Sequence, residues 1–290
     1  MSVLCLIANP AEPALDDKMV GAIQHETGGE INWLCQRVAC DIILPKAADP
    51  LPIARQYLAG KPIDAALVAL AHRRKKILVA DMDSTMIDQE CIDEIADAVG
   101  IKAEVAAITA RAMNGELDFA QALRTRVGLV KGLERRVLEE IRRERITLAA
   151  GGRALVQTMK AYGAYTSLVS GGFTYFADYY AKRIGFDEAI ANVLEFDGDA
   201  LAGTVADPIV DKTTKLNRLQ SLAAEQSIPM AATLAVGDGA NDLDMIQAAG
   251  LGVALHAKPV VAEQAGVRID HGDLTALLYL QGFEEDDFVR

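Results

Sequence analysis

Two aspartates, Asp81 and Asp83, follow directly after the apolar run ILVA (77–80). If the strand geometry continues, both side chains leave the backbone on the same side. Like charges that close raise each other's pKa and destabilise a fold unless a positive group lies between them. Taken alone, the stretch DMDST fits a capping aspartate beside a loop acid as well as it fits a catalytic pair.

A second acidic motif follows another apolar run. In AVGDGANDLDM (235–245), Asp238 lies between two glycines and is followed by Asn241 and Asp242. Glycines let a backbone turn tightly and approach a ligand, and carboxylates are hard oxygen ligands of the kind that Mg²⁺ prefers. GDGAND alone also fits a simple turn, but acids at two strand ends favour a divalent cation, Mg²⁺, that keeps several carboxylates ionised together.

Two further segments could bind an anion. In SLVSGGFTYF (167–176), Ser170 ends an apolar run, and we expect the dipeptide Gly171-Gly172 to open a helix. Amides at a helix N-terminus together with a hydroxyl form an anion site. Lys215, in DKTTKLNRL, could contact a phosphoryl oxygen. Each has an ordinary alternative: a glycine-rich turn and a surface lysine.

Short apolar runs must position these residues. They are ILVA (77–80), YTSLVS (165–170), TLAV (233–236) and LGVAL (251–255), and segments of helical period separate them. Apolar strands alternating with helices indicate a parallel sheet covered on both faces, in which ligands bind at the carboxyl ends of the strands. The predicted fold class is therefore α/β, with a Rossmann-like parallel sheet.

Two insertions and an N-terminal region complete the predicted organisation. Residues 91–150 have helical periodicity and are expected to form a cap, and VLEFDGDALAGTVA (193–206) reads as a hairpin turning at Asp197-Gly198. Residues 1–72 follow a β-α-β-β-α-β pattern, typical of a ferredoxin-like α+β domain. We expect domains at 1–72 and 73–290.

Composition narrows the class of protein. The chain has 290 residues, a net charge of −12 and a pI of about 4.8, which argue against a nucleic-acid or anionic-membrane surface. The basic run at 72–76 reads as a solvated linker. The 4 cysteines have no CxxC spacing and fit reduced thiols. With no signal-peptide pattern and no bilayer-length apolar run, a cytoplasmic protein is expected.

The four motifs around Asp81, Ser170, Lys215 and Asp238 resemble those of the haloacid dehalogenase (HAD) superfamily of phosphotransferases. Within it, DMDSTMIDQECIDEIA, ITARAMNGELDFAQALRTRV, LVSGGF and VGDGANDLDM are similar to the phosphoserine phosphatase family, across residues 75 to about 285. Several members carry ACT-type regulatory domains before the catalytic domain. Residues 1–72 are compatible with a degenerate ACT-like domain, although no motif in them indicates amino-acid sensing.

The resemblance implies roles for the acidic residues. Asp81 would be the nucleophile that forms an aspartyl-phosphate, and Asp83 the general acid and then the general base. Asp81, the backbone carbonyl of Asp83, and Asp238 would hold Mg²⁺. Asp242 would orient these ligands or their waters.

The resemblance also assigns the substrate contacts. Ser170, the Gly171 amide and Lys215 would hold the phosphoryl oxygens, and Asn241 would fix Lys215 or the phosphate. Glu90 would bind the substrate ammonium and Arg126 its carboxylate. Two apolar cap residues, Met113 and Phe119, would close over the substrate.

The predicted function is Mg²⁺-dependent hydrolysis of O-phospho-L-serine to L-serine and phosphate, the last step of serine biosynthesis, by an enzyme that could dimerise through its N-terminal domain. The alternative within enzymes is a related phosphatase or phosphotransferase that acts on another small phosphomonoester, such as phosphothreonine or phosphohomoserine. A phospho-accepting signalling module is a different class, and Asp83 and the cap argue against it. Dinucleotide binding is excluded because GDGAND lies late in the chain and lacks GxGxxG.

Overall fold

The central feature of the fold is a six-stranded parallel sheet. The computed structural model describes residues 1–45, 49–113 and 116–289. The strand order is β12-β11-β10-β5-β6-β7, and every pairing is parallel. The strands are β5 (Ile77–Ala80), β6 (Tyr165–Phe173), β7 (Glu188–Asn192), β10 (Thr233–Gly237), β11 (Leu251–Leu255) and β12 (Val267–Ile269). The predicted α/β class is confirmed.

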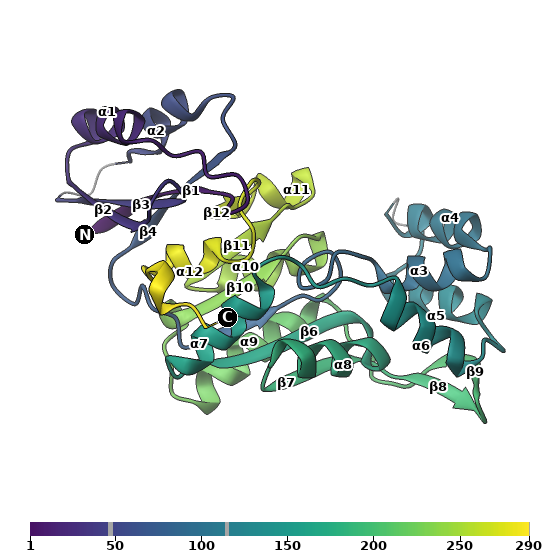
Figure 1. The fold of residues 1–290 in the computed structure, drawn as a ribbon. Coiled ribbons are helices and arrows are strands. Elements are labelled where there is room, and N and C mark those ends of the chain that lie inside the picture. The colour runs from purple at the N-terminus through teal and green to yellow at the C-terminus, as the bar shows by residue number, and fades with distance from the viewer. Residues whose placement is uncertain (46–48, 114–115, 290) are drawn as a thin grey trace.

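Helices cover both faces of this sheet (Figure 1). They are α7 (Gly152–Ala161), α8 (Thr174–Ile184), α9 (Lys212–Glu225), α10 (Leu243–Ala248), α11 (Pro259–Ala262) and α12 (Ala276–Leu280), with short 3₁₀ turns η1 (Met230–Ala232), η2 (Ala240–Asp242) and η3 (Glu285–Asp287). Ile77 and Val79 pack toward α9, whereas Leu78 and Ala80 pack on the opposite side with α7 and α12. Strand β5 is apolar at every position because both of its faces are buried.

The cap combines the two predicted insertions. It contains α3 (Cys91–Ala98), α4 (Lys102–Met113), α5 (Phe119–Leu129) and α6 (Arg135–Glu144), together with the hairpin β8 (Leu194–Asp197) and β9 (Ala200–Val205). The hairpin turns at Gly198, as predicted, and lies beside α5 and α6 (Figure 1). Leu201 exchanges backbone hydrogen bonds with Gly132 and Leu133, at 2.8 and 2.9 Å. Among the described residues, no helix has the length and apolar character needed to cross a membrane.

A separate antiparallel sheet precedes the parallel one. Its elements are β1 (Ser2–Ala8), α1 (Asp17–Thr27), β2 (Glu30–Cys35), β3 (Ala39–Leu44), α2 (Leu51–Leu58) and β4 (Ile63–Ala69), with strand order β2-β3-β1-β4. The predicted β-α-β-β-α-β order is confirmed, while the boundary at residue 72 and the ACT-like assignment stay predictions. Leu4 and Leu6 pack under α1 and α2, and Val3, Cys5 and Ile7 belong to the core that contains α12. Strand β1, in the middle of this sheet, is therefore buried on both faces.

The basic run at 72–76 joins the two sheets as the predicted linker, but it is only partly solvated, because Arg73 is half-buried and Lys75 is buried. Arg73 donates to both carboxylate oxygens of Asp41, each at 2.7 Å, and Asp41 is only 1% exposed. Arg74 stacks 3.6 Å from the centroid of the Phe283 ring. A buried acid needs a paired cation, and Arg73 supplies it from 32 residues away in sequence.

A second contact ties the N-terminal sheet to the end of β12. The carboxylate of Asp64, on β4, accepts hydrogen bonds from the backbone amides of Asp270, His271 and Gly272. Asp64 is 5% exposed, so its charge is satisfied by these amides rather than by water.

Candidate active site

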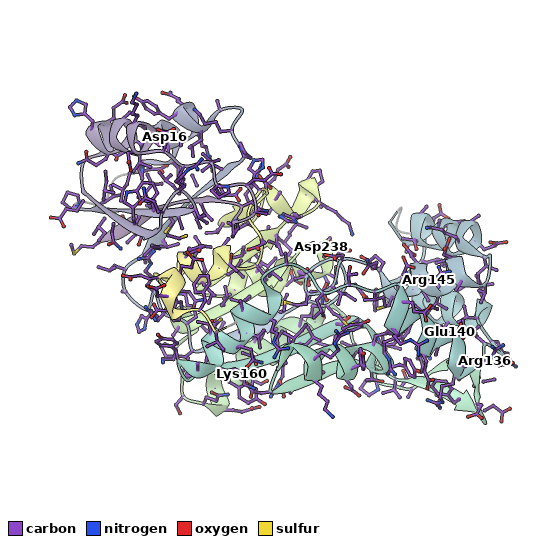
Figure 2. The ribbon with its side chains drawn as sticks, viewed as in Figure 1. Asp16, Arg136, Glu140, Arg145, Lys160 and Asp238 are labelled. Carbon is purple, nitrogen blue, oxygen red and sulfur yellow. The ribbon has the colours of Figure 1, made fainter. Side chains whose placement is uncertain are left out.

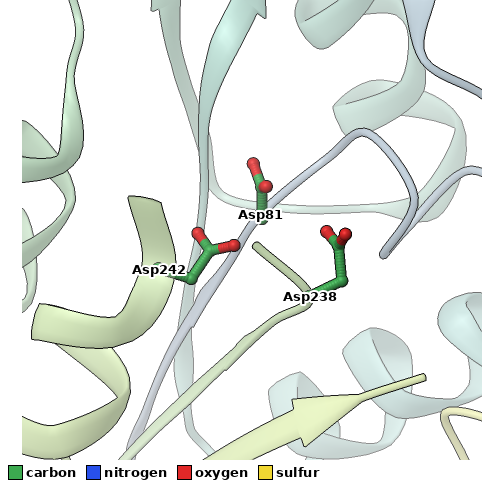
Figure 3. Close-up of side chains that lie close together, drawn as sticks. All are labelled: Asp81, Asp238 and Asp242. Atoms are coloured by element: carbon green, nitrogen blue, oxygen red, sulfur yellow. The ribbon is translucent and has the colours of Figure 1, made fainter. Parts of the chain in front are cut away.

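Three carboxylates converge at the carboxyl ends of neighbouring strands (Figure 3). Asp81 follows β5, and Asp238 follows β10, which pairs with β5 in parallel. Asp242 ends η2, and oxygens of all three side chains lie within 4.8 Å of one another. The turn needs glycine at position 237, because a Cβ there would lie 2.3 Å from the Asp242 Cγ. The two acidic motifs predicted to act together therefore do meet.

Lys215 reaches this cluster from α9, whose first turn is capped by the Asp211 side chain. Its Nζ lies 2.7 Å from Asp81 Oδ1 and 2.5 Å from Asp242 Oδ1, and the side chain is 1% exposed. Burial opposes its charge, but the two carboxylates raise the pKa of Lys215 above its ordinary value. Lys215 is thus a buried, charged lysine and not a surface residue.

Asp242 holds Lys215 in place. Its Oδ1 accepts from Lys215, and its Oδ2 accepts from the Gly239 amide at 3.0 Å. Asn241 makes no hydrogen bond to Lys215 in the described part of the chain, but it lines the neighbouring cavity. Of the two contacts predicted for Asn241, the one to Lys215 is absent, and the one to phosphate stays a prediction.

The cluster holds more negative than positive charge. Burial, followed by the charge of Asp81, raises the pKa of Asp238 to about 6 and that of Asp242 to about 7. A divalent cation would supply the missing positive charge, and carboxylate oxygens are the donors it prefers. Because both oxygens of Asp242 are already bonded, Asp81 and Asp238 are the side chains best placed to hold the ion.

Asp83 and Glu90 lie on the loop between β5 and α3. Burial and the neighbouring charge of Glu90 raise the pKa of Asp83 well above its usual range. The Asp83 carboxylate accepts a hydrogen bond from the Cys91 amide at 3.3 Å. Its Oδ2 lies close to Gly172, where an added Cβ would be 2.8 Å away. Asp83 therefore faces the anion-binding segment predicted around Ser170.

Two hydroxyls that the sequence reasoning missed support these acids. Ser84 donates to Glu90 Oε1 at 3.0 Å from a backbone with φ of +56°, in the left-handed region that non-glycine residues rarely adopt. Thr85 donates to Asp238 at 3.3 Å. The available signal was the Ser-Thr pair that directly follows DMD.

The glycine segment after Ser170 lies in a strand. Strand β6 continues to Phe173 and α8 begins at Thr174, so the prediction that Gly171-Gly172 open a helix is wrong by two residues. The Ser170 Oγ accepts from the Gly172 amide at 2.9 Å, and Asn192 donates to the Gly171 carbonyl at 2.8 Å. These bonds fix the conformation of this strand segment beside Asp83.

A cavity of about 730 Å³ separates this sheet edge from the cap. Figure 2 shows Asp238 at the sheet edge, while Arg136, Glu140 and Arg145 lie on the cap. Among the predicted site residues whose side chains the structure describes, all except Lys215 and Asp242 line the cavity. The side chain of Met113 lies outside the described residues.

Two cap residues face the catalytic edge across the cavity. Arg126 donates to the Ala122 carbonyl at 3.3 Å and has no carboxylate within 4.0 Å in the described ranges. Burial lowers its pKa. The ring of Phe119 lies over Gly171, where an added Cβ would be 3.1 Å from the Phe119 Cζ. The cavity lining therefore contains both a cation, Arg126, and an acid, Glu90.

Lys258 is a lining residue that no sequence motif revealed. Its Nζ lies 3.8 Å from Asp238 Oδ2, and its backbone amide donates to the Asp238 carbonyl at 3.1 Å. The side chain is 59% exposed, so it contributes a mobile positive charge at the mouth of the cavity.

A family model described as "haloacid dehalogenase-like hydrolase" matches residues 78–247, more than half of the chain. The chain belongs to this family. The match begins within β5 and ends within α10, so it contains both acidic motifs and Lys215. Members of this family that act as phosphatases are generally metal-dependent, in agreement with the aspartate cluster.

Individual relatives have sequences similar to this chain over most of its length. It is 44% identical to a phosphoserine phosphatase of Streptomyces coelicolor over 79% of this chain and 56% of that protein. It is 48% identical to a phosphoserine phosphatase of Haemophilus influenzae over 70% of this chain and 65% of that protein. The chain thus spans less than two thirds of the length of these relatives. A crystal structure of a HAD family hydrolase from Salmonella enterica serovar Typhi superposes with a TM-score of 0.85 at 30% identity, covering 99% of both chains.

Proposed function

We propose that this chain is a phosphoserine phosphatase, a phosphoric monoester hydrolase that converts O-phospho-L-serine to L-serine and phosphate. The observation that carries the proposal is one cavity lined by Asp81, Glu90 and Arg126. Asp81 pairs with the buried Lys215 behind the lining, and Arg126 has no ion-pair partner among the described residues. Relatives named phosphoserine phosphatase, at 44% and 48% identity, support it.

Asp81 is proposed as the nucleophile. In the described part of the chain its hydrogen bonds, from Lys215 and from the Met82 amide, both go to Oδ1, which leaves Oδ2 to attack phosphorus. An aspartate carboxylate can act as a nucleophile and form a covalent intermediate. The new bond joins Oδ2 to phosphorus as the bond from phosphorus to the serine oxygen breaks.

Asp83 is proposed to move the proton. Its raised pKa favours the protonated carboxyl, which can donate its proton to the departing serine oxygen. The resulting carboxylate then accepts a proton from the water that attacks phosphorus, and Asp81 leaves as a free carboxylate. The cycle returns both aspartates to their starting states.

Lys215, Ser170 and the Gly171 amide are proposed to stabilise the phosphoryl oxygens as charge builds on them. When bound, a divalent cation, which we propose is Mg²⁺, would neutralise the repulsion between Asp81 and the phosphate. Asp81, Asp238 and the backbone carbonyl of Asp83 are its proposed ligands.

Glu90 and Arg126 are proposed to select an amino acid. The two charges lie on the lining of the same cavity and match the ammonium and the carboxylate of phosphoserine. The guanidinium can bind a carboxylate with two parallel hydrogen bonds. Phe119 and Met113 are proposed to close the cavity over the bound substrate.

The assay is phosphate release from O-phospho-L-serine, O-phospho-L-threonine, glucose 6-phosphate and an aryl phosphate, with Mg²⁺ and after chelation. Arg126→Ala should lower kcat/KM for phosphoserine about 100-fold, since a charged hydrogen-bonded pair contributes roughly 3 kcal/mol. For the aryl phosphate, which has no carboxylate, kcat/KM should stay within about threefold of the wild-type value. Arg124→Ala is the matched control, because Arg124 lies on the same helix but is 45% exposed and pairs with Asp207. Equal turnover of glucose 6-phosphate and phosphoserine would refute the assignment.

The remaining parts of the proposal concern the cellular location and the oligomeric state of the protein. We propose a cytoplasmic enzyme that forms a homodimer through its N-terminal domain. Strand β2 is an edge of the N-terminal sheet, and Ile31 on it is 40% exposed, which supports pairing with a second copy. Light scattering of the purified protein measures the mass, and a monomer at micromolar concentration contradicts the dimer.

A further inference from the structure

A second cavity, of about 450 Å³, lies where the N-terminal sheet meets the parallel sheet. Its walls come from β4, from the segment before β5, from η1 and from the segments around β11 and β12. The lining contains two cationic side chains, Arg73 and Lys75, and no aspartate or glutamate. In a chain with a net charge of −12, a cavity with only positive charge is unexpected.

Arg73 is already paired within the protein. Its guanidinium donates to both oxygens of Asp41 and to the carbonyls of Tyr279 and Leu280. Its charge and its donors are therefore used in joining the two sheets.

Lys75 differs from Arg73 because its charge is not paired. The residue is 8% exposed, and its Nζ donates to the Ala231 carbonyl at 2.7 Å. Within the described residues, no carboxylate lies close enough to Lys75 to form an ion pair. An ammonium group has three donors, so the Ala231 bond leaves two for another partner.

The environment of Lys75 is unfavourable for its charge. Burial lowers its pKa to about 8, and no charged neighbour opposes that effect. Buried charges in proteins are normally paired. A buried lysine without a counter-ion lowers the stability of the fold, and when it lies beside a cavity it is a candidate for binding an anionic ligand.

We propose that this cavity binds a small organic monocarboxylate, whose carboxylate pairs with the Lys75 ammonium. The apolar walls, which include Leu67, Leu251 and Leu280, favour an aliphatic tail, and Gln247 and Gln264 supply polar atoms in the lining. A free amino acid does not fit, because the lining offers no acid for its ammonium group. This proposal is independent of the reaction at Asp81.

The test uses the full chain, labelled with ¹⁵N, and pentanoate as the probe. We expect saturable shifts of the Gly250 and Gly252 amides, which line the cavity. Pentylammonium, with a tail of the same length, and norvaline, which adds an ammonium to the same acid, should not produce them. Shifts confined to Gly171 and Gly239 would place the anion at the other cavity and overturn the proposal.

Three variants assign the binding to Lys75. Lys75→Met keeps the length of the chain and should weaken pentanoate at least about tenfold, the loss expected for one charged hydrogen bond. Lys75→Arg keeps the charge and should retain binding within about threefold. Lys76→Met is the matched control, since the Lys76 Nζ donates instead to the Tyr162 carbonyl outside the cavity. Equal affinity in Lys75→Met and wild type, or no shift at Gly250 and Gly252 in the wild type, would disprove the site.

Discussion

Ser84 gives the sharpest test of how the proposed substrate site is built. It lies between the paired aspartates and Glu90, and its hydroxyl donates to Glu90 at 3.0 Å. Its backbone φ of +56° is unfavourable for a residue with a Cβ. Unfavourable backbone conformations of this kind cluster at functional sites, where the side chain has a role. We therefore expect Ser84 to orient Glu90 toward the substrate ammonium.

Removing the hydroxyl should affect one substrate and not another. A hydrogen bond to a charged group contributes about 1.5–3 kcal/mol, which corresponds to roughly 10- to 150-fold in rate. Glu90 is half-buried and keeps some contact with water, so we expect Ser84→Ala to fall at the low end, about tenfold in kcat/KM for phosphoserine, and mainly in KM. An aryl phosphate has no ammonium, so kcat/KM for this substrate should change by less than about twofold.

Two further substitutions separate the hydroxyl from the backbone. Ser84→Gly also lacks the hydroxyl but accepts a positive φ, so it should lose the same selectivity and be about 1 kcal/mol more stable than Ser84→Ala. Ser84→Thr keeps the hydroxyl and should keep the selectivity. The assay is steady-state kinetics on both substrates with urea unfolding of each variant. An equal loss on both substrates in Ser84→Ala would show that Ser84 supports the loop and does not orient Glu90.

Three other predictions follow from contacts described above. Asp81→Asn should reduce turnover more than about 1000-fold with unchanged urea unfolding; phosphate release near the wild-type rate would contradict its role as nucleophile. Asp41→Asn leaves the Arg73 charge buried without a counter-ion and should lower the free energy of unfolding by about 3–5 kcal/mol, whereas Asp287→Asn, beside the 42% exposed Arg74, should change it by less than about 0.5 kcal/mol. The pKa of Lys75 is about 8 in the folded protein, below its ordinary value of 10.5. Between pH 8 and pH 10.5 the unfolded chain therefore binds more protons than the folded chain, so the contribution of Lys75 to stability rises with pH. Lys75→Met should therefore be more stable than wild type by up to about 3 kcal/mol below pH 8, with the difference shrinking toward pH 10.5 in urea titrations; a constant difference would contradict this.

The sequence alone predicted those elements whose structure is determined by a local pattern of residues. Strand β5 could be predicted because both faces are buried and all four of its residues are apolar. Parallel pairing then required Asp81 and Asp238 to meet at one edge of the sheet. Strands β7 and β12 were missed because EAIAN is half-polar and VRI has only three residues.

Other features depended on partners far away in the chain. Nothing in DKTTKLNRL distinguishes the buried Lys215 from an exposed lysine, since its burial comes from Asp81 and Asp242. The basic run looked solvated because Asp41, the partner of Arg73, has no recognisable motif. Lys258 reaches the cavity only because the segment after β11 returns to Asp238.

The burial of both faces of β1 has a consequence for synthesis on the ribosome. Strand β1 is translated well before α12, which completes the core around Val3 and Ile7 and ends at Leu280. At roughly 5–20 residues per second, the intervening chain takes on the order of tens of seconds to emerge. During that interval an apolar sheet face stays exposed on the nascent chain. Chaperone occupancy should therefore persist until α12 has left the exit tunnel.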